Sequence, residues 1–395
     1  MAYNDTLKEM LPFLHTDSNC TLCGACVQSC SKGCIFIEND VLKNDFSECI
    51  NCNKCVQSCH AINTNKAGFA ASKEAFAVWS LDETDRKTST SGGAASVFYQ
   101  VAVDNGYYIC GAEFNKQLLP VLTVSREKEK IKKYKQSKYV YSMSEDVFSK
   151  IKELLLKKEC VLFIALPCQV AALKQFLGKP YNNLVTVDIV CHGTPSSTIL
   201  EQYINNIDVE NKATQVIFRE DNQYVMKLLD NDSNIIYKRR GRTDPYLAAF
   251  LDGLSYRDCC YSCSYARPER VSDITIGDFW GLGQEKPFNH PYTGSISLVL
   301  LNTEKGKNFF EKCKYKLFYE QRDVIEAIKG NAQLQRPTNK HTMQEQFWKL
   351  TNEKGFEFAV NICLSNEMKK EKKKLFKNDV RLGLSKIKKV LTGRK

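Results

Sequence analysis

Eight cysteines stand at regular intervals within the first sixty residues of this 395-residue chain. They form two copies of the pattern CxxCxxCxxxC, the first beginning at Cys20 and the second at Cys49. A tight CxxCxxC turn places three thiolates on one face of an iron-sulfur cubane, and the fourth cysteine points toward the other cluster. The spacing therefore predicts two 4Fe-4S clusters, one held by Cys20, Cys23, Cys26 and Cys59 and the other by Cys49, Cys52, Cys55 and Cys30.

Zinc knuckles and a disulfide framework are the alternatives to this interpretation. Zinc sites usually take their ligands in two pairs, whereas each copy has four cysteines at intervals of three, three and four. The start, "MAYNDTLKEM", lacks a basic stretch followed by an apolar one, which predicts no secretory signal and a cytoplasmic chain, where disulfides are rare. Cys34 falls outside the pattern, and we expect a small buried residue there rather than a ligand.

Residues 11–65 resemble a bacterial two-cluster ferredoxin module. That family usually has proline after each fourth cysteine, whereas Ser31 and His60 stand at those positions here. We therefore expect a small ferredoxin-like domain over 11–65 that carries single electrons, followed by a linker around "NTNKAG" (63–68).

Alternating strand-like and helix-like runs follow from residue 74 onward and predict an α/β domain with substantially parallel strands over 74–365, so that the chain is α+β overall. The predicted strands are 74–80, 107–112, 160–165, 184–190 and 274–277, and the predicted helices are 92–105, 145–158, 169–178 and 196–207.

Further cysteines lie in the loops at strand ends, where such a sheet holds ligands. Cys168 and Cys191 each follow a predicted strand, and Cys260 and Cys263 form a CxxC pair before the strand at 274–277. These four thiols could close a third cubane, or two or three of them could be core or inert loop cysteines. Cys259 competes with Cys260, although only Cys260 forms a CxxC with Cys263.

Several segments together resemble the coenzyme F420 hydrogenase/dehydrogenase beta-subunit family over roughly residues 75–300: "TSTSGGAASVF", "SKYVYS", "ALPCQVAALKQFL", "VDIVCHGTPS", "FRE" and "SDITIGDFWG". The resemblance implies a flavin-binding α/β domain that holds FAD and one 4Fe-4S cluster, the latter on Cys168, Cys191, Cys260 and Cys263. It also implies hydride transfer between the flavin and a deazaflavin or another organic substrate. Family members with a fused ferredoxin module include reductases of chlorophyll-type pigments and proteins associated with surface-polysaccharide synthesis.

A flavin is also expected on chemical grounds, because cubanes pass single electrons while most organic reductions need a hydride. No GxGxxG follows a strand. The predicted diphosphate site is "TSTSGGAAS", where Ser91, Gly92 and Gly93 open a helix, although one of these serines could equally be an ordinary N-cap. Lys138 could add a positive charge to this site or could simply be solvated.

Other polar and aromatic residues near these segments have less specific patterns. We expect His192 to pack beside the third cluster rather than to act as a general acid. Asp278, Phe279 and Trp280 could form a rigid wall beside a flavin or a cluster, or could be core residues. No Ser-His-Asp arrangement or carboxylate pair supports a hydrolase.

The net charge of +11 is concentrated at the C-terminus, where residues 366–395 hold twelve Lys or Arg and three acids. Apolar residues recur there at helical spacing: Phe376, Val380, Leu384, Ile387 and Leu391. This basic tail could lie on an anionic membrane surface, bind an acidic partner, or close one end of the domain as a solvated helix. No run is long enough to span a membrane, and no nucleic-acid-binding motif is present.

The sequence predicts an iron-sulfur flavoprotein oxidoreductase. A low-potential donor, such as ferredoxin or a reduced deazaflavin coenzyme, would supply electrons that reduce an organic substrate, with the reverse direction equally allowed. The alternative is an electron-transfer subunit of a larger complex that has no substrate of its own. A structural zinc protein is a third hypothesis.

Overall fold

The structure is a computed structural model that describes residues 19–64, 68–220, 223–292 and 294–392. The chain divides into two compact units, residues 1–198 with 256–339 and residues 199–255 with 340–395. The domains predicted over 11–65, 74–365 and 366–395 stay predictions. Parts of them lie outside the described residues: 11–18, residues 65–67 of the linker, and the side chains of Leu384, Ile387 and Leu391.

The first unit begins with two short helices on either side of a hairpin. Helix α2 (Ala25–Ser29) and helix α3 (Lys54–Ser58) enclose the antiparallel strands β1 (Ile35–Glu38) and β2 (Val41–Asn44). The two helices start in the same way, because Gly24 and Asn53 both precede them in the left-handed conformation, with φ of 74° and 57°. The repeated cysteine spacing therefore corresponds to a repeated backbone conformation.

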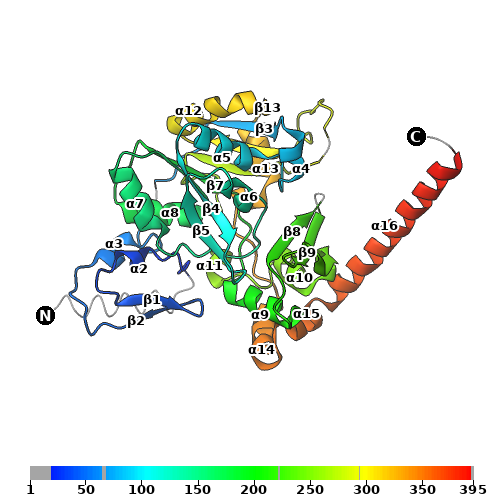
Figure 1. The fold of residues 1–395 in the computed structure, drawn as a ribbon, viewed down its shortest axis with the longest axis horizontal. Coiled ribbons are helices and arrows are strands. Elements are labelled where there is room, and N and C mark those ends of the chain that lie inside the picture. The colour runs from blue at the N-terminus through cyan, green and yellow to red at the C-terminus, as the bar shows by residue number, and fades with distance from the viewer. Residues whose placement is uncertain (1–18, 65–67, 221–222, 293, 393–395) are drawn as a thin grey trace. The chain divides into compact units, whose positions relative to one another are not determined.

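An eight-stranded mixed sheet forms the centre of the first unit, in the order β13-β3-β12-β11-β7-β6-β4-β5 (Figure 1). Strands β4, β6, β7 and β11 are parallel to one another, and the outer strands pair antiparallel. The predicted α/β class is confirmed. The strand bounds are β3 (Glu74–Ser80), β4 (Tyr108–Phe114), β5 (Pro120–Ser125), β6 (Val161–Ala165), β7 (Leu184–Ile189), β11 (Ile274–Asp278), β12 (Ser297–Leu301) and β13 (Leu317–Arg322).

Helices cover both faces of this sheet, as strand β6 shows. Leu162 and Ile164 join the core beneath α5 (Ala94–Asp104) and α12 (Glu304–Cys313), whereas Phe163 joins the core beneath α7 (Val147–Leu156) and α8 (Pro167–Leu177). A strand buried on both faces reads as a continuous apolar run. The remaining helices of this unit are α4 (Glu83–Lys87), α6 (Lys130–Tyr134), α11 (Asp258–Tyr261) and α13 (Val324–Gly330), with the short turns η3 (Lys314–Lys316) and η4 (Ala332–Leu334).

The N-terminal helices pack on the same unit. Ala25 of α2 and Cys23 belong to the apolar core that α7 and α8 form with the sheet. The amide of Ser149 on α7 donates to Gln28 Oε1 of α2 at 3.0 Å. The segment that carries the eight regularly spaced cysteines is therefore anchored to the helices that flank strand β6.

The second unit contains the antiparallel sheet β10-β9-β8 and a group of helices. Its buried centre is aromatic: Tyr246 packs against Tyr203, Phe218 and Phe356. Asp244, fully buried, caps helix α10 through the Leu247 amide and accepts from the Tyr203 hydroxyl. The elements are α9 (Ser197–Ile207), β8 (Gln215–Glu220), β9 (Gln223–Leu229), β10 (Ile235–Arg240), η2 (Gly241–Thr243), α10 (Pro245–Leu251), α14 (Gln344–Lys354), α15 (Phe356–Cys363) and α16 (Ser365–Thr392).

Within the described part of the chain, no helix combines the length and the apolar composition that a membrane crossing needs.

Candidate functional site

Twelve predicted ligands gather around three separate pockets of the first unit. The first pocket, here called the inner pocket, is lined by the four cysteines predicted for the first cluster together with Thr21, Gly24 and His60: Cys20, Cys23, Cys26 and Cys59. Three of these cysteines come from the turn into α2 and one from the end of α3. The structure therefore brings the fourth cysteine of the second copy to the first three of the first copy.

The second pocket, here called the outer pocket, shows the reciprocal arrangement. It is lined by the cysteines predicted for the second cluster: Cys49, Cys52, Cys55 and Cys30. Cys34 also lines it, is buried, and donates its amide to Cys30 Sγ at 3.3 Å. Burial opposes ionisation of Cys30, but the neighbouring amides outweigh it and lower its pKa.

Solvent exposure separates these two pockets. Cys23, Cys26 and Cys59 are each 8% exposed, whereas Cys52 is exposed. Burial raises the pKa of Cys23 to about 12, so this thiol resists ionisation unless a cation compensates its charge. Four thiols around one desolvated pocket fit an iron-sulfur group, because iron supplies that compensation and thiolates are its usual ligands.

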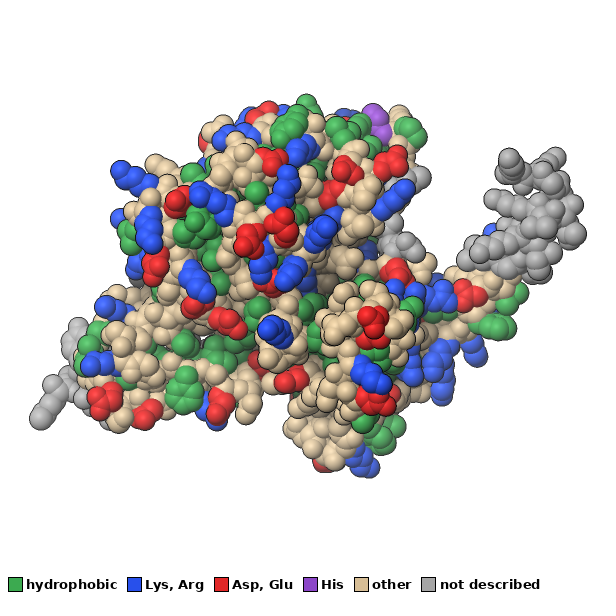
Figure 2. All heavy atoms as spheres, in the orientation of Figure 1, with side chains coloured by type: hydrophobic (Ala, Val, Ile, Leu, Met, Phe, Trp, Pro, Cys, Tyr) green, Lys and Arg blue, Asp and Glu red, His purple; other side chains and the backbone are tan. Residues whose placement is uncertain are grey.

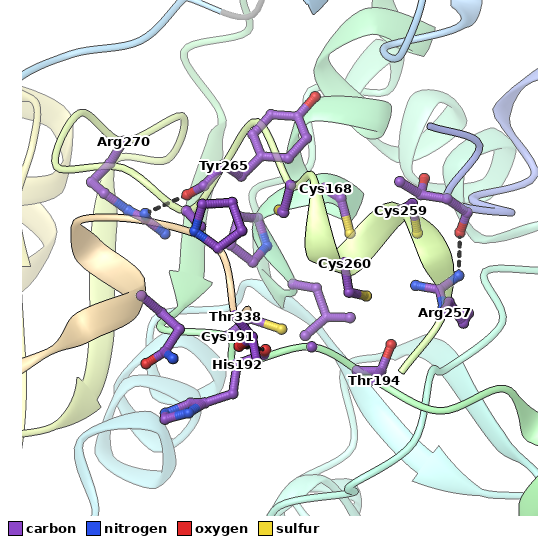
Figure 3. A pocket seen from close by; sticks show the side chains of 18 residues that line it. Cys168, Cys191, His192, Thr194, Arg257, Cys259, Cys260, Tyr265, Arg270 and Thr338 are labelled. Carbon is purple, nitrogen blue, oxygen red and sulfur yellow. Dashed lines mark hydrogen bonds between the residues drawn. The ribbon is translucent and has the colours of Figure 1, made fainter. Parts of the chain in front are cut away.

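The third pocket gathers the loop cysteines at the strand ends of the sheet (Figure 3). Cys168 lies in the first turn of α8, directly after strand β6, and Cys191 follows strand β7. Cys260 lies on the short helix α11, and Cys263 follows it. All four predicted thiols line this pocket, so the structure brings together residues from three distant loops.

Cys259 lines the third pocket as well, and it forms a hydrogen bond with Cys260. This hydrogen bond lowers the pKa of Cys260 to about 6, whereas the pKa of Cys259 is raised. Of the two thiols, Cys260 is thus the one whose ionisation is favoured. Burial raises the pKa of Cys168 and Cys263, and that of Cys191 to about 12.

Two arginines line the third pocket and were not predicted, Arg257 partly buried and Arg270 buried. The Arg257 guanidinium lies 3.6 Å from the centre of the Tyr141 ring and donates to the carbonyl oxygen of Thr21 at 2.7 Å. Its Nε atom is buried without a partner. Arg270 is 2% exposed and lies 3.1 Å from the carboxylate of Asp188, which is fully buried. Arg257 therefore gives the pocket a positive charge, whereas the charge of Arg270 is balanced by Asp188.

Arg257 has no salt bridge to a carboxylate within the described ranges. Burial opposes its charge, but the thiols of Cys259 and Cys260 outweigh this effect and raise the pKa of Arg257 above its usual value. A partly buried guanidinium without a carboxylate requires another source of negative charge. An anionic group held by the thiols of this pocket would supply it.

The inner and third pockets share a wall. Thr21 lines both pockets. Its hydroxyl lies 2.8 Å from His60 Nε2, and His60 Nδ1 lies 2.6 Å from the hydroxyl of Tyr265, which lines the third pocket. His60 stands where the ferredoxin family usually has proline, and this difference was the only sequence signal for the contact between the two pockets. Nothing in the sequence identified Tyr265 as the hydrogen-bond partner of His60.

The residues predicted to hold a flavin diphosphate make internal contacts. A Cβ on Gly92 would lie 2.4 Å from the carbonyl oxygen of Val78, so glycine is needed there for close approach to strand β3. Gly93 is the N-cap of α5 with φ of 94°. Ser91 Oγ is buried without a partner, and the ammonium of Lys138 donates to the backbone carbonyls of residues 133, 135 and 136.

A buried carboxylate already lies near the start of α5. Asp85 accepts from the hydroxyl of Ser96 and from Lys135, each at 2.6 Å, and its second oxygen has no hydrogen-bond partner. This negative charge disfavours a second anion at the same place. The assignment of Ser91, Gly92, Gly93 and Lys138 to a flavin stays a prediction.

The remaining predicted residues lie near strand β11 and the third pocket. His192 lines that pocket, and burial lowers its pKa. Phe279 is buried and Trp280 is 48% exposed, while Asp278 Oδ1 is buried without a partner. Among the described residues, no three His, Cys, Asp or Glu side chains lie close enough together to hold a single metal ion.

Comparison with known proteins identifies the region that contains the third pocket. Residues 158–327 match a family model that describes the C-terminal part of the beta subunit in coenzyme F420 hydrogenase/dehydrogenase. A chain in the solved F420-reducing nickel-iron hydrogenase complex from Methanosarcina barkeri, studied as a xenon derivative, shares 16% sequence identity with a TM-score of 0.44. The alignment covers 72% of this chain and 94% of that chain. No curated protein matches the chain.

Proposed function

Because residues 158–327 match the coenzyme F420 hydrogenase/dehydrogenase beta-subunit family, we propose that this chain is an iron-sulfur oxidoreductase with three 4Fe-4S sites. The observation that carries the proposal is that the twelve predicted cysteines line three pockets, four to each, with Cys34 as an additional member of the outer pocket and Cys259 of the third. In this proposal the inner pocket uses Cys20, Cys23, Cys26 and Cys59, the outer pocket Cys49, Cys52, Cys55 and Cys30, and the third pocket Cys168, Cys191, Cys260 and Cys263.

Clusters in these pockets would supply one-electron transfer, and a flavin would convert single electrons into a hydride. The protein's own contribution is positioning. The exposed Cys52 places the outer pocket next to solvent, where a low-potential donor such as ferredoxin or a reduced deazaflavin can approach. Thr21, His60 and Tyr265 hold the inner and third pockets against a common wall. This order supports electron flow from the surface toward the sheet.

We also propose that the chain binds FAD and acts on an organic substrate. Two arguments support FAD. The family resemblance implies it, and the reduction of an organic substrate by hydride requires a carrier of two electrons, which a flavin can be. The contacts of Gly92, Gly93 and Lys138 are internal, so these three residues lend the flavin proposal no further support, whereas Ser91 Oγ is buried without a partner. Quantitation of flavin in the purified protein tests the FAD proposal separately. A protein that contains iron but no flavin would overturn the FAD proposal and leave the iron-sulfur proposal standing.

The matched family is described as a beta subunit, which favours a second candidate function. In that case the chain would pass electrons within a larger complex and would have no substrate of its own. Copurification of a stoichiometric partner, with no turnover of small-molecule acceptors by the isolated chain, would support this second function. Turnover of an organic acceptor by the isolated chain would support the first.

The decisive test of the proposal is the iron content of two adjacent cysteine variants. After anaerobic purification we expect about 12 irons and a similar amount of acid-labile sulfide per chain. Cys260→Ser should reduce iron to about 8, because it removes a ligand of the third cluster. Cys259→Ser is the matched control and should retain about 12 irons. A Cys260→Ser protein with full iron content would contradict the third site, and zinc in place of iron would contradict all three.

A further inference from the structure

Helix α16 carries a strongly cationic surface between residues 369 and 381. Seven cations fall in this stretch and all are exposed: Lys369, Lys370, Lys372, Lys373, Lys374, Lys377 and Arg381. Figure 2 shows Lys and Arg side chains gathered along the described part of this helix. The only acids in the stretch are Glu371 and Asp379.

The two acids lie on the face of α16 that packs on the second unit. Met368, Glu371, Leu375 and Asp379 recur along α16 at spacings of three, four and four, which places them on one face. Leu364 and Met368 are buried, and Asp379 forms a bidentate ion pair with Arg240, in which the bond from Nη1 measures 3.2 Å. Glu371 lies against Gly241 of the same unit. With both acids counted, seven cations against two acids still leave residues 369–381 with a net charge of +5.

Two large apolar side chains stand among the outward cations. Phe376 is 71% exposed and Val380 is 45% exposed. Together with Lys369 and Lys373 they follow spacings of four, three and four, so they share a second face, about 100° around the helix from Met368 and Asp379. A helix face that combines lysines with an exposed aromatic residue suits the boundary between lipid headgroups and acyl chains.

We propose that this face of α16 docks on an anionic lipid surface. The charge complementarity is direct, because anionic headgroups attract clusters of four to eight Lys or Arg. The exposed Phe376 and Val380 would enter the interfacial region, where they lose contact with water. This attachment is peripheral and independent of the proposed redox function, since none of the cysteines of the three pockets lies on α16.

The test is sedimentation of the full-length holoprotein with lipid vesicles. We expect binding to vesicles of phosphatidylcholine mixed with phosphatidylglycerol, no binding to phosphatidylcholine alone, and weaker binding at high salt. The triple variant Lys369→Glu/Lys373→Glu/Lys377→Glu should weaken binding at least about a hundredfold. Phe376→Ser should weaken it about tenfold, because an apolar contact is lost.

A matched control carries the same change of charge elsewhere. Lys116, Lys132 and Lys157 are exposed residues of the first unit, and their triple replacement by Glu should keep wild-type binding. Equal loss in this control, absence of vesicle binding by the wild type, or binding only to an acidic protein would overturn the proposal. Iron content is measured for every variant, so a failure of the cluster assignment is recognised independently.

Discussion

The positive charge of the third pocket depends on one residue in particular. Arg257 is partly buried beside Cys259 and Cys260, stacks on Tyr141, and reaches the backbone of Thr21. The groups that stabilise its positive charge are cysteine thiols rather than a carboxylate. A positive charge fixed beside a redox group stabilises the reduced, more negative form of that group. We therefore interpret Arg257 as a residue that sets a reduction potential.

Arg257→Met should lower the reduction potential of the third site by roughly 100–200 mV, which corresponds to about 2–4 kcal/mol for charges roughly 4–8 Å apart at an effective dielectric constant of about 20. Arg257→Lys keeps the charge and should restore most of this loss. Potentiometric titration followed by electron paramagnetic resonance measures the change, with the outer-pocket site as internal reference. An unchanged potential in Arg257→Met, with iron content intact, would rule out this role.

At the scale of elements, three short segments meet at Asp85. The carboxylate lies on α4, accepts from Ser96 of α5, and pairs with Lys135, the residue that ends α6. The side chains of Asp85 and Lys135 are only 7% and 12% exposed. The segment that was predicted to bind a diphosphate is therefore positioned by a buried ion pair.

Asp85→Ala should lower the free energy of unfolding by about 3–5 kcal/mol, because it leaves a buried ammonium without its partner. The double variant Asp85→Ala/Lys135→Met should recover part of this loss. Urea denaturation of the anaerobic holoprotein measures both. Glu83→Ala removes an exposed pair with Lys87 and should cost less than about 1 kcal/mol. Equal costs for Asp85→Ala and Glu83→Ala would show that burial of the pair is unimportant.

Local patterns sufficed to predict the strands that precede Cys168 and Cys191, but not the short helices α2, α3 and α11 that carry other cysteines. The runs at 74–80, 160–165 and 184–190 were recognisable as strands because they are buried on both faces and largely apolar. Strands β12 and β13, which lie next to β3 in the sheet, were not predicted. The contact of His60 with Tyr265 was also beyond reach, since 205 positions separate the two residues. Such contacts depend on the tertiary fold and cannot be derived from the spacing of residues along the sequence.

At the scale of the whole molecule, the N-terminal segment has little apolar core of its own. Between residues 19 and 64 the structure has two five-residue helices and a hairpin of four-residue strands. The apolar cluster inside this segment has four buried members, of which two are cysteines: Cys26, Ile35, Leu42 and Cys59. Elements this short are marginal without additional support. Metal ligation would supply part of the folding free energy.

Removal of iron by oxidation and chelation should therefore loosen residues 19–64 more than the central sheet. Hydrogen exchange measured by mass spectrometry should rise in this segment, while strands β6 and β7 keep their protection because they are buried in the core. Restoring iron and sulfide should reverse the change. Equal exchange in the loaded and iron-free proteins would show that metal contributes nothing to the folding of this segment.

Thr21 belongs to the N-terminal segment, yet it lines the pocket that contains Cys168 and Cys191. A chain truncated before residue 74 would lose two candidate sites and would also leave the remaining pocket open on one side. A separate electron carrier in solution would not rebuild that side. The fusion of the two segments is thus more than a tether, because residues of both line the third pocket.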